Sequence, residues 1–181
     1  MPDTSPMLEA LHADGPAPDR AEAMRLYGRF VGSWRGTLSY PETDGRRRET
    51  SAEVHFDWAL QGRAVQDVWI APARDLRQPG EPEVIYGTTL RIYDPAQDHW
   101  HIVWNDPVRQ AYDHLIGRAV GNDIVQEFRL PSGARCQWIF TDIAEDSFRW
   151  LRRESSDEGA TWERRGEFLL RRVASRPARA A

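Results

Sequence analysis

Residues 84–104 read VIYGTTLRIYDPAQDHWHIVW, two runs rich in β-branched and aromatic residues around a turn at Asp94–Pro95. In each run bulky apolar residues alternate with polar ones, which is the period of a β-strand with one buried face. Two such runs joined by a short polar turn are typical of an antiparallel hairpin. The stretch therefore predicts strands over 84–93 and 99–105.

The same pattern continues in both directions from Gly32 to about residue 171, with turn residues every ten to fifteen positions. No helix-length periodic segment interrupts it, so consecutive strands are expected to pair antiparallel as a meander. If the first and last strands of the meander pair with each other, the sheet closes into a barrel and has no unpaired strand edge. We therefore predict an all-β fold, an antiparallel up-and-down barrel of about ten strands. The remaining expected strands cover 34–40, 50–60, 63–71, 111–117, 123–130, 134–142, 147–154 and 161–171.

The two ends of the chain lack this alternation. Residues 1–19 are rich in Pro, Ala, Asp and Gly, and we expect a flexible N-terminal tail. From Arg20 to Val31 apolar residues fall at helical spacing, so a short amphipathic helix is expected to precede the barrel. We predict a single domain over 20–173 and a flexible C-terminal tail over 174–181.

Composition excludes several classes of function. The chain of 181 residues has a net charge of −4 with both signs interspersed, so neither nucleic acid nor a membrane is an expected partner. All 24 basic residues are arginine, which removes lysine Schiff-base and P-loop chemistry. The single cysteine, Cys136, lies in an apolar run and is expected to be an inert core thiol. With no leader or membrane span visible, we expect a cytoplasmic location.

The run Gly32-Ser33-Trp34-Arg35-Gly36 opens the first strand after a short helix. It resembles the glycine-x-tryptophan signature of lipocalins and other calycins, in which the tryptophan closes the barrel floor beneath the helix. Together with segments 58–64, 86–95 and 146–150, the region from about 24 to 172 looks like a group of uncharacterised bacterial calycin-like barrel proteins. This resemblance implies a fold and a ligand cavity, and it implies no activity.

Segment 33–41 also resembles the opening of the nitrobindins, ten-stranded barrels that hold haem through a histidine near their C-terminal end. The chain has no histidine after His114, so that iron ligand is missing. We predict no cofactor.

Residues 155–162, SSDEGATW, fit the Asp-box pattern of propeller blades, but the pattern occurs once in a chain too short for a propeller. We interpret it as a hairpin turn held by Asp157 and Gly159, with Trp162 packed beneath.

Alternation predicts which side chains face the lumen if the bulkier partners mark the inward face. The chain has 8 tryptophans, and at least five of them face inward on this register, which gives a wide aromatic lumen. Such a composition is typical of a pocket for a small organic ligand. The expected ligand-binding residues are Trp58, Trp69, Tyr86, Trp104, Tyr112, Gln126, Trp138, Trp150 and Arg152.

Two polar residues on predicted inward faces suggest chemistry. A pair of Asp67 and His114 would suit acid–base catalysis, because a carboxylate orients an imidazole and tunes it near neutral pH. These are the candidate catalytic residues. His99 and His101 share one strand face, but the glutamate and third histidine of a cupin-like metal site are missing, so no metal is predicted.

Three hypotheses remain open. The barrel binds a small hydrophobic or aromatic molecule; or it is a cofactor-independent acid–base isomerase, cyclase or lyase acting on such a molecule; or it is packed solid and acts through its outer surface, for instance as a homodimer.

Overall fold

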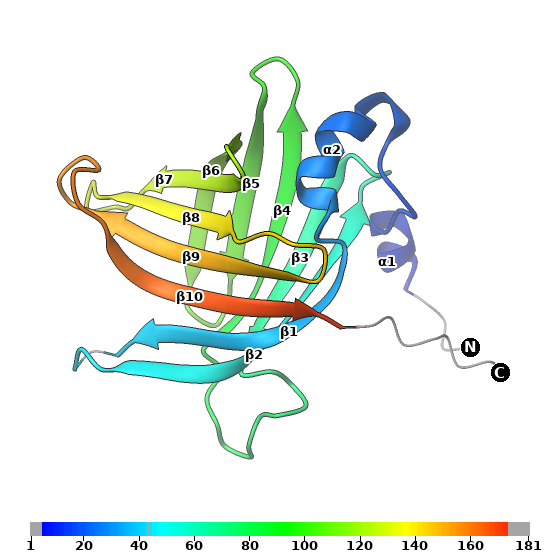
Figure 1. Ribbon diagram of the computed structural model, residues 1–181. Helices are drawn as coiled ribbons and strands as arrows, with labels where there is room; N and C mark the ends of the chain where they lie inside the picture. The colour runs from blue at the N-terminus through cyan, green and yellow to red at the C-terminus, as the bar shows by residue number, and fades with distance from the viewer. Residues whose placement is uncertain (1–4, 43, 174–181) are drawn as a thin grey trace.

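The structure, a computed structural model, describes residues 5–42 and 44–173 and contains ten antiparallel strands closed into one barrel. Strands follow one another around the barrel in chain order, and β10 returns to pair with β1 (Figure 1). The predicted fold class is confirmed. The strands are β1 (Gly32–Pro41), β2 (Arg47–Ala59), β3 (Ala64–Ala71), β4 (Ile85–Asp94), β5 (His99–Asp106), β6 (Ala111–Val120), β7 (Asp123–Arg129), β8 (Arg135–Thr141), β9 (Ser147–Ser155) and β10 (Glu163–Arg172).

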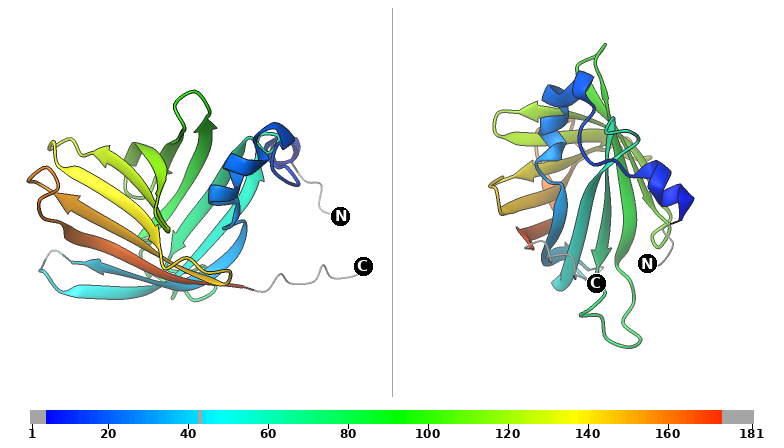
Figure 2. Two further views of the ribbon diagram at one scale, coloured as in Figure 1. Left: turned by 45° about the horizontal axis from the view of Figure 1, so that its top comes forward. Right: turned by 90° about the vertical axis from the view of Figure 1, so that its right-hand side faces the viewer.

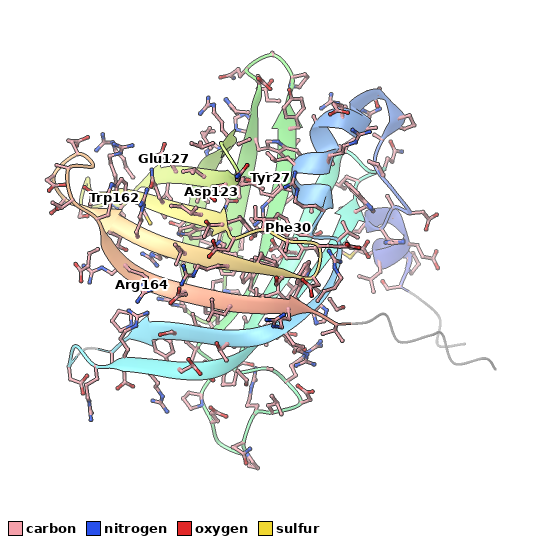
Figure 3. The ribbon with its side chains drawn as sticks, viewed as in Figure 1. Tyr27, Phe30, Asp123, Glu127, Trp162 and Arg164 are labelled. Carbon is pink, nitrogen blue, oxygen red and sulfur yellow. The ribbon has the colours of Figure 1, made fainter. Side chains whose placement is uncertain are left out.

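Three short helical elements precede the barrel: α1 (Pro6–Leu11), the 3₁₀ turn η1 (Pro18–Arg20) and α2 (Ala21–Gly28). Helix α2 lies across one end of the barrel (Figure 2). Met24 and Tyr27 of α2 and Phe30 after it are buried, and Tyr27 and Phe30 point into the barrel (Figure 3). No helix in the described part of the chain is long and apolar enough to cross a membrane.

The segment before α2 differs from the expected flexible tail over residues 1–19. The N–H of Ala13 donates to Trp58 O at 3.1 Å, and the N–H of Ala17 donates to Gly62 O at 2.9 Å. Ala17 is itself buried. These backbone bonds fix the segment to the turn between β2 and β3, an interaction that composition does not reveal. Residues 1–4 and 174–181 lie outside the described residues.

Trp34 closes the barrel beneath α2, as the glycine-x-tryptophan run predicts. Its side chain is fully buried, and its indole N–H donates to Phe30 O at 2.7 Å. The ring packs edge-on against Phe148 with centroids 4.7 Å apart. Arg172 covers the other face of the ring, its guanidinium carbon 4.2 Å from the centroid, and donates to Val31 O and Arg29 O at 2.7 Å each. Trp34 thus joins the helix, the first strand and the last strand.

The Asp-box segment forms the turn between β9 and β10. Asp157 accepts hydrogen bonds from the backbone N–H and the hydroxyl of Thr161 at 2.9 and 2.6 Å, which lowers the pKa of its carboxyl. Gly159 has φ of +99°, and Trp162 lies under the guanidinium of Arg153. The hairpin interpretation is confirmed.

Replacing Trp34 with alanine is expected to lower the free energy of unfolding by about 3–5 kcal/mol, because it leaves a cavity among rings that have little freedom to collapse. Urea denaturation measures this. The control is Trp162→Ala, since Trp162 lies on the outer surface against Arg135 and Arg153 and contributes on the order of 1 kcal/mol. Equal losses in the two variants would contradict the proposed role of Trp34.

Candidate functional site

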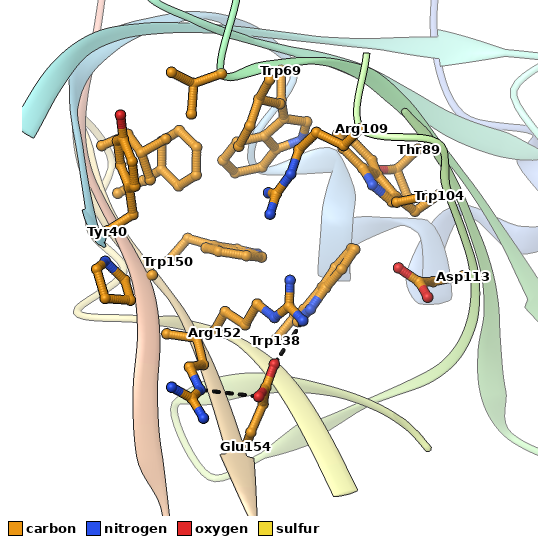
Figure 4. A pocket seen from close by; sticks show the side chains of 18 of the residues that line it. Tyr40, Trp69, Thr89, Trp104, Arg109, Asp113, Trp138, Trp150, Arg152 and Glu154 are labelled. Carbon is orange, nitrogen blue, oxygen red and sulfur yellow. Dashed lines mark hydrogen bonds and ion pairs between the residues drawn. The ribbon is translucent and has the colours of Figure 1, made fainter. Parts of the chain in front are cut away.

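The half of the barrel away from α2 encloses a cavity of about 850 Å³ that opens at the end of the barrel. Figure 4 shows its tryptophan and arginine side chains. Its volume lies in the range of small-molecule sites. The lining residues are Leu38, Tyr40, Pro41, Glu42, Asp44, Trp69, Val84, Ile85, Thr89, Arg91, Trp104, Arg109, Ala111, Asp113, Leu130, Trp138, Trp150, Arg152, Glu154, Arg165, Gly166 and Phe168.

Aromatic rings in mutual contact form the wall of the cavity. The centroid of Trp150 lies 5.6 Å from that of Trp69 and 5.4 Å from that of Trp138. Trp104 packs edge-on against Trp138 at 5.8 Å. A Cβ added at Gly87 would lie 2.5 Å from the Trp104 ring, so only glycine permits this ring to lie against β4. The rings hold each other in place, which makes the wall rigid before any ligand binds.

A buried ion pair forms the floor of the cavity. Arg91 of β4 and Asp67 of β3 are each 1% exposed, and the guanidinium Nη1 bonds directly to Asp67 Oδ2. The second carboxylate oxygen of Asp67 accepts the N–H of Thr89 at 2.9 Å. The Arg91 guanidinium also stands 5.0 Å from the Tyr27 ring and 5.6 Å from the Phe140 ring. Burying this charge is tolerable because a carboxylate and aromatic faces surround it.

Gln126 of β7 and Tyr27 extend this polar floor. The Gln126 amide oxygen accepts from Arg91 Nε and from the Tyr27 hydroxyl, both at 3.3 Å. Burial raises the pKa of Tyr27, which keeps its hydroxyl a neutral donor. Among the described residues the Gln126 amide nitrogen has no hydrogen-bond partner. The network ties three strands to α2, and apart from the Gln126 amide nitrogen its side chains bond mainly to one another.

Arg152 and Trp138 face each other across β9 and β8 and place polar groups on the aromatic wall. Arg152 Nη2 donates to Glu154 at 2.6 Å, and Glu154 also accepts from Arg165 at 3.0 Å. Arg152 Nε and Trp138 Nε1 are both buried and have no hydrogen-bond partner in the described residues, although the thiol of Cys136, a weak acceptor, lies near both side chains. We call these two N–H groups the donor pair. A buried donor without an acceptor costs about 1–3 kcal/mol, and a ligand oxygen can recover this cost.

Asp113 of β6 and Arg109 add charge to the opposite wall (Figure 4). Burial raises the pKa of the Asp113 carboxyl, although Arg152 and Arg109 act in the opposite direction. A carboxyl with a raised pKa in a cavity is a candidate for proton transfer. By contrast, burial raises the pKa of Cys136 to about 11, which keeps this thiol protonated and unreactive.

The structure brings several predicted site residues together. Trp69, Trp104, Trp138, Trp150 and Arg152 all line the cavity, while Gln126 and Asp67 face the lumen below it in the floor network. Trp58 lies at the closed end, where its ring packs against the Cα of Gly28. It does not line the cavity.

The predicted register was wrong for β4 and β6. Tyr86 and Tyr112 are 38% and 65% exposed, and His114 is also exposed on the outer wall. Asp67 and His114 therefore lie on opposite sides of the wall, and the predicted catalytic pair does not form. The inward positions of β4 and β6 carry small residues such as Gly87 and Gly117, because rings from Trp104 and Tyr27 occupy the space above them. The bulkier residues of a strand therefore do not mark its inward face where a ring from another element already fills the lumen.

Sequence reasoning missed part of the site. The inward faces of β4 and β6 were assigned incorrectly, and they carry Thr89, Arg91 and Asp113. Shifting the predicted register of these strands by one residue would have placed the three side chains inward. Arg165 reaches the cavity mouth because the β9–β10 register shifts between Arg164 and Gly166. A bulge of this kind re-aims a side chain and leaves no clear mark in the alternation.

Among the described residues that line the cavity there is no histidine. The described residues hold one histidine and aspartate group with metal-ligand spacing, on the outer wall, at Asp94, His99 and His101.

Neither a protein-family model nor a curated protein matches this sequence. The fold is similar to that of Rv2717c from M. tuberculosis, with a TM-score of 0.56 and 15% identity, covering 87% of this chain and 99% of that one. It is equally similar to the S-type phycobiliprotein lyase CPES from Guillardia theta, with a TM-score of 0.56 and 14% identity, covering 85% and 94%.

A third chain, EF1p2_mFAP2b bound to DFHBI, aligns with a TM-score of 0.41, 13% identity and coverage of 82% and 97%, which adds nothing to the fold assignment. The first two likenesses concern the barrel fold alone. They lend no support to the narrower resemblance to nitrobindins.

Replacing Arg91 with methionine is expected to destabilise the protein by about 3–5 kcal/mol, because Asp67 would keep a buried charge without its partner. The double variant Asp67→Leu/Arg91→Met should recover most of this loss, since no charge then remains buried. As a control, Arg129→Met removes the exposed pair with Glu158 and should cost under about 1 kcal/mol. Chemical denaturation of each variant measures these changes in the free energy of unfolding. A double variant no more stable than Arg91→Met would contradict this account of the floor.

Proposed function

We propose that the barrel binds a small aromatic molecule that carries an anionic, oxygen-rich group such as a carboxylate or sulfonate. The observation that carries the proposal is the donor pair, Trp138 Nε1 and Arg152 Nε, which has no hydrogen-bond partner among the described residues and lies on a wall of tilted and edge-on aromatic rings. The rings offer a flat apolar surface to an aromatic body, and the donors offer hydrogen bonds to its acidic group.

The size and openness of the cavity support the same proposal. A volume of about 850 Å³ leaves room for a ligand of several rings, so the barrel is packed at its closed end and hollow at its open end. Arg109 also lines this space and adds a cationic group to the wall opposite Arg152. One protein of similar fold is named a phycobiliprotein lyase, but at 14% identity the likeness concerns the fold, and the cavity carries the argument.

The probe for this proposal is 8-anilinonaphthalene-1-sulfonate, an aromatic sulfonate, compared with uncharged 1-anilinonaphthalene. Arg152→Met should weaken sulfonate binding roughly 10- to 100-fold, because a charge-assisted hydrogen bond is lost, and should leave the uncharged probe nearly unaffected. Probe fluorescence and quenching of the wall tryptophans both report binding.

The matched control is Arg153→Met. Arg153 is the next residue on β9 but points outward, where it donates to Gln137 at 2.8 Å and covers Trp162. The Arg153→Met protein should bind both probes as tightly as the unmodified protein does. Equal weakening by the two variants, or an unmodified protein that does not prefer the sulfonate, would contradict the proposal.

A second candidate function is proton transfer on the bound ligand by a cofactor-independent isomerase, cyclase or lyase. It is favoured by one observation, the raised pKa of the half-buried Asp113 carboxyl in the cavity wall. This residue replaces Asp67 and His114 as the acid–base candidate, because Asp67 is committed to Arg91 and His114 lies outside.

Replacing Asp113 with asparagine separates the two candidates. Above its raised pKa the carboxylate repels a sulfonate, so binding should tighten as the pH falls through that pKa, and Asp113→Asn should bind tightly at all pH values. If Asp113 transfers a proton, turnover of a ligand identified by native mass spectrometry should also fall by about 10²–10⁴-fold. No turnover of that ligand by the unmodified protein would leave binding as the function, and unchanged turnover in Asp113→Asn would exclude Asp113 as the acid–base residue.

A further inference from the structure

The outer wall of the barrel carries a cluster of three histidines and an aspartate that no part of the cavity argument uses. His99 and His101 lie on β5, His114 on β6, and Asp94 at the end of β4. Strand pairing places Asp94 opposite His99, and β6 lies beside β5 on its other side. Four nitrogen- and oxygen-bearing side chains are thereby collected on one outer face.

The facing atoms of this cluster have the spacing of metal ligands. Nε2 of His101 lies 3.4 Å from Nε2 of His99 and 3.5 Å from Oδ2 of Asp94. In a tetrahedral site with bonds of about 2.0–2.1 Å, neighbouring ligand atoms are separated by about 3.3 Å. Two of the three separations therefore match the edge of a coordination tetrahedron, and all three ligand atoms lie within 4.8 Å of one another.

Contacts around the cluster hold two of these side chains in position. Asp94 Oδ1 accepts the backbone N–H of Ala96 at 2.8 Å, and Oδ2, which accepts Gln97 Nε2 at 3.2 Å, is turned toward His101. His101 Nδ1 lies 3.2 Å from His114 Nε2, and the two rings stack at 5.4 Å. A ligand histidine commonly donates its second ring N–H to such an acceptor, which fixes its tautomer and orientation.

We propose that Asp94, His99 and His101 bind one divalent transition-metal ion such as Zn²⁺, with His114 as the residue that positions His101. Two imidazoles and a carboxylate suit Zn²⁺, and three protein ligands leave a fourth position for water. His99 is 5% exposed, whereas the side chains of His101 and Asp94 are 39% and 23% exposed, so the ion would lie at the surface with a path to solvent. The predicted absence of a metal site rested on chain spacing, and the missing partners come from neighbouring strands.

In the metal-free protein Arg118 holds His99 in the tautomer that cannot bind the metal through Nε2. Its Nη2 lies 3.1 Å from His99 Nδ1, and a guanidinium only donates, so His99 carries its proton on Nε2, the atom that faces His101. Metal binding needs that atom free and the proton on Nδ1, so Arg118 must withdraw. Because Arg118 is exposed on β6, it can move into solvent.

The test is calorimetric titration of untagged, metal-free protein with Zn²⁺. We expect one ion per chain. Asp94→Asn and His101→Ala should each weaken binding by at least about 10-fold, and Co²⁺ should give the visible spectrum of a four-coordinate site. The control is His12→Gln: His12 has carboxylates of Asp14 and Asp57 at 3.4 and 3.3 Å but no second histidine, so its loss should not change binding. No Zn²⁺ uptake, or uptake that Asp94→Asn and His101→Ala leave intact, would overturn the proposal.

Two further variants distinguish an ordered site from loose chelation by surface histidines. Arg118→Glu removes the donor beside His99 and should tighten Zn²⁺ binding about 10-fold or more, and because its carboxylate can itself bind the metal it is compared with Arg118→Met, which adds no ligand and should also tighten binding. His114→Leu should weaken binding about 10-fold, and His114→Gln, which keeps an acceptor for His101, should restore most of it. Thermal melting without metal checks that each variant is folded. Weaker binding in Arg118→Glu, or identical affinities for His114→Leu and His114→Gln, would contradict the assigned roles.

Discussion

The buried ion pair between Arg91 and Asp67 divides the lumen into two halves with different properties. A guanidinium inside a barrel is stable only if a carboxylate and aromatic faces replace its water, and Asp67, Tyr27 and Phe140 supply them. Below the pair, the rings of Phe30, Phe56, Phe140 and Phe148 pack against one another. Above it, the barrel stays open. The pair is thus both the top of the core and the floor of the cavity.

Contacts at the closed end of the barrel stabilise the fold, which allows the other end to stay open. Trp34 and Arg172 join α2 to the first and last strands, so closure of the barrel does not depend on side chains that fill the open half. Because the core supplies stability, the open half can tolerate rings that border a cavity and a donor pair without hydrogen-bond partners in the described structure. Because one half stabilises the fold and the other half holds the cavity, we assign ligand binding to the open half.

The sequence was sufficient for the architecture but only partly for the site. Alternation and turn residues predicted all ten strands, and the run around Trp34 predicted the closed end, because both are local patterns. Lumen residues were predicted where bulky side chains do face inward, as with Trp138 and Arg152. The prediction failed on β4 and β6, where Gly87 and Gly117 yield space to Trp104 and Tyr27 from other elements. Such non-local packing, like the outer histidine cluster, is visible only when neighbouring strands are in place.

The central claim is that an anionic aromatic ligand binds in the open half against the donor pair. Nuclear magnetic resonance of ¹⁵N-labelled indole groups tests it most directly, since the 8 tryptophans report separately from the cavity, the closed end and the outer surface. Titration with an aromatic sulfonate should shift the Trp138 Nε1–H signal most, with smaller shifts for Trp69, Trp104 and Trp150 and none for Trp34 or Trp162. A ligand that left Trp138 unmoved, or that shifted Trp162 more, would contradict the account.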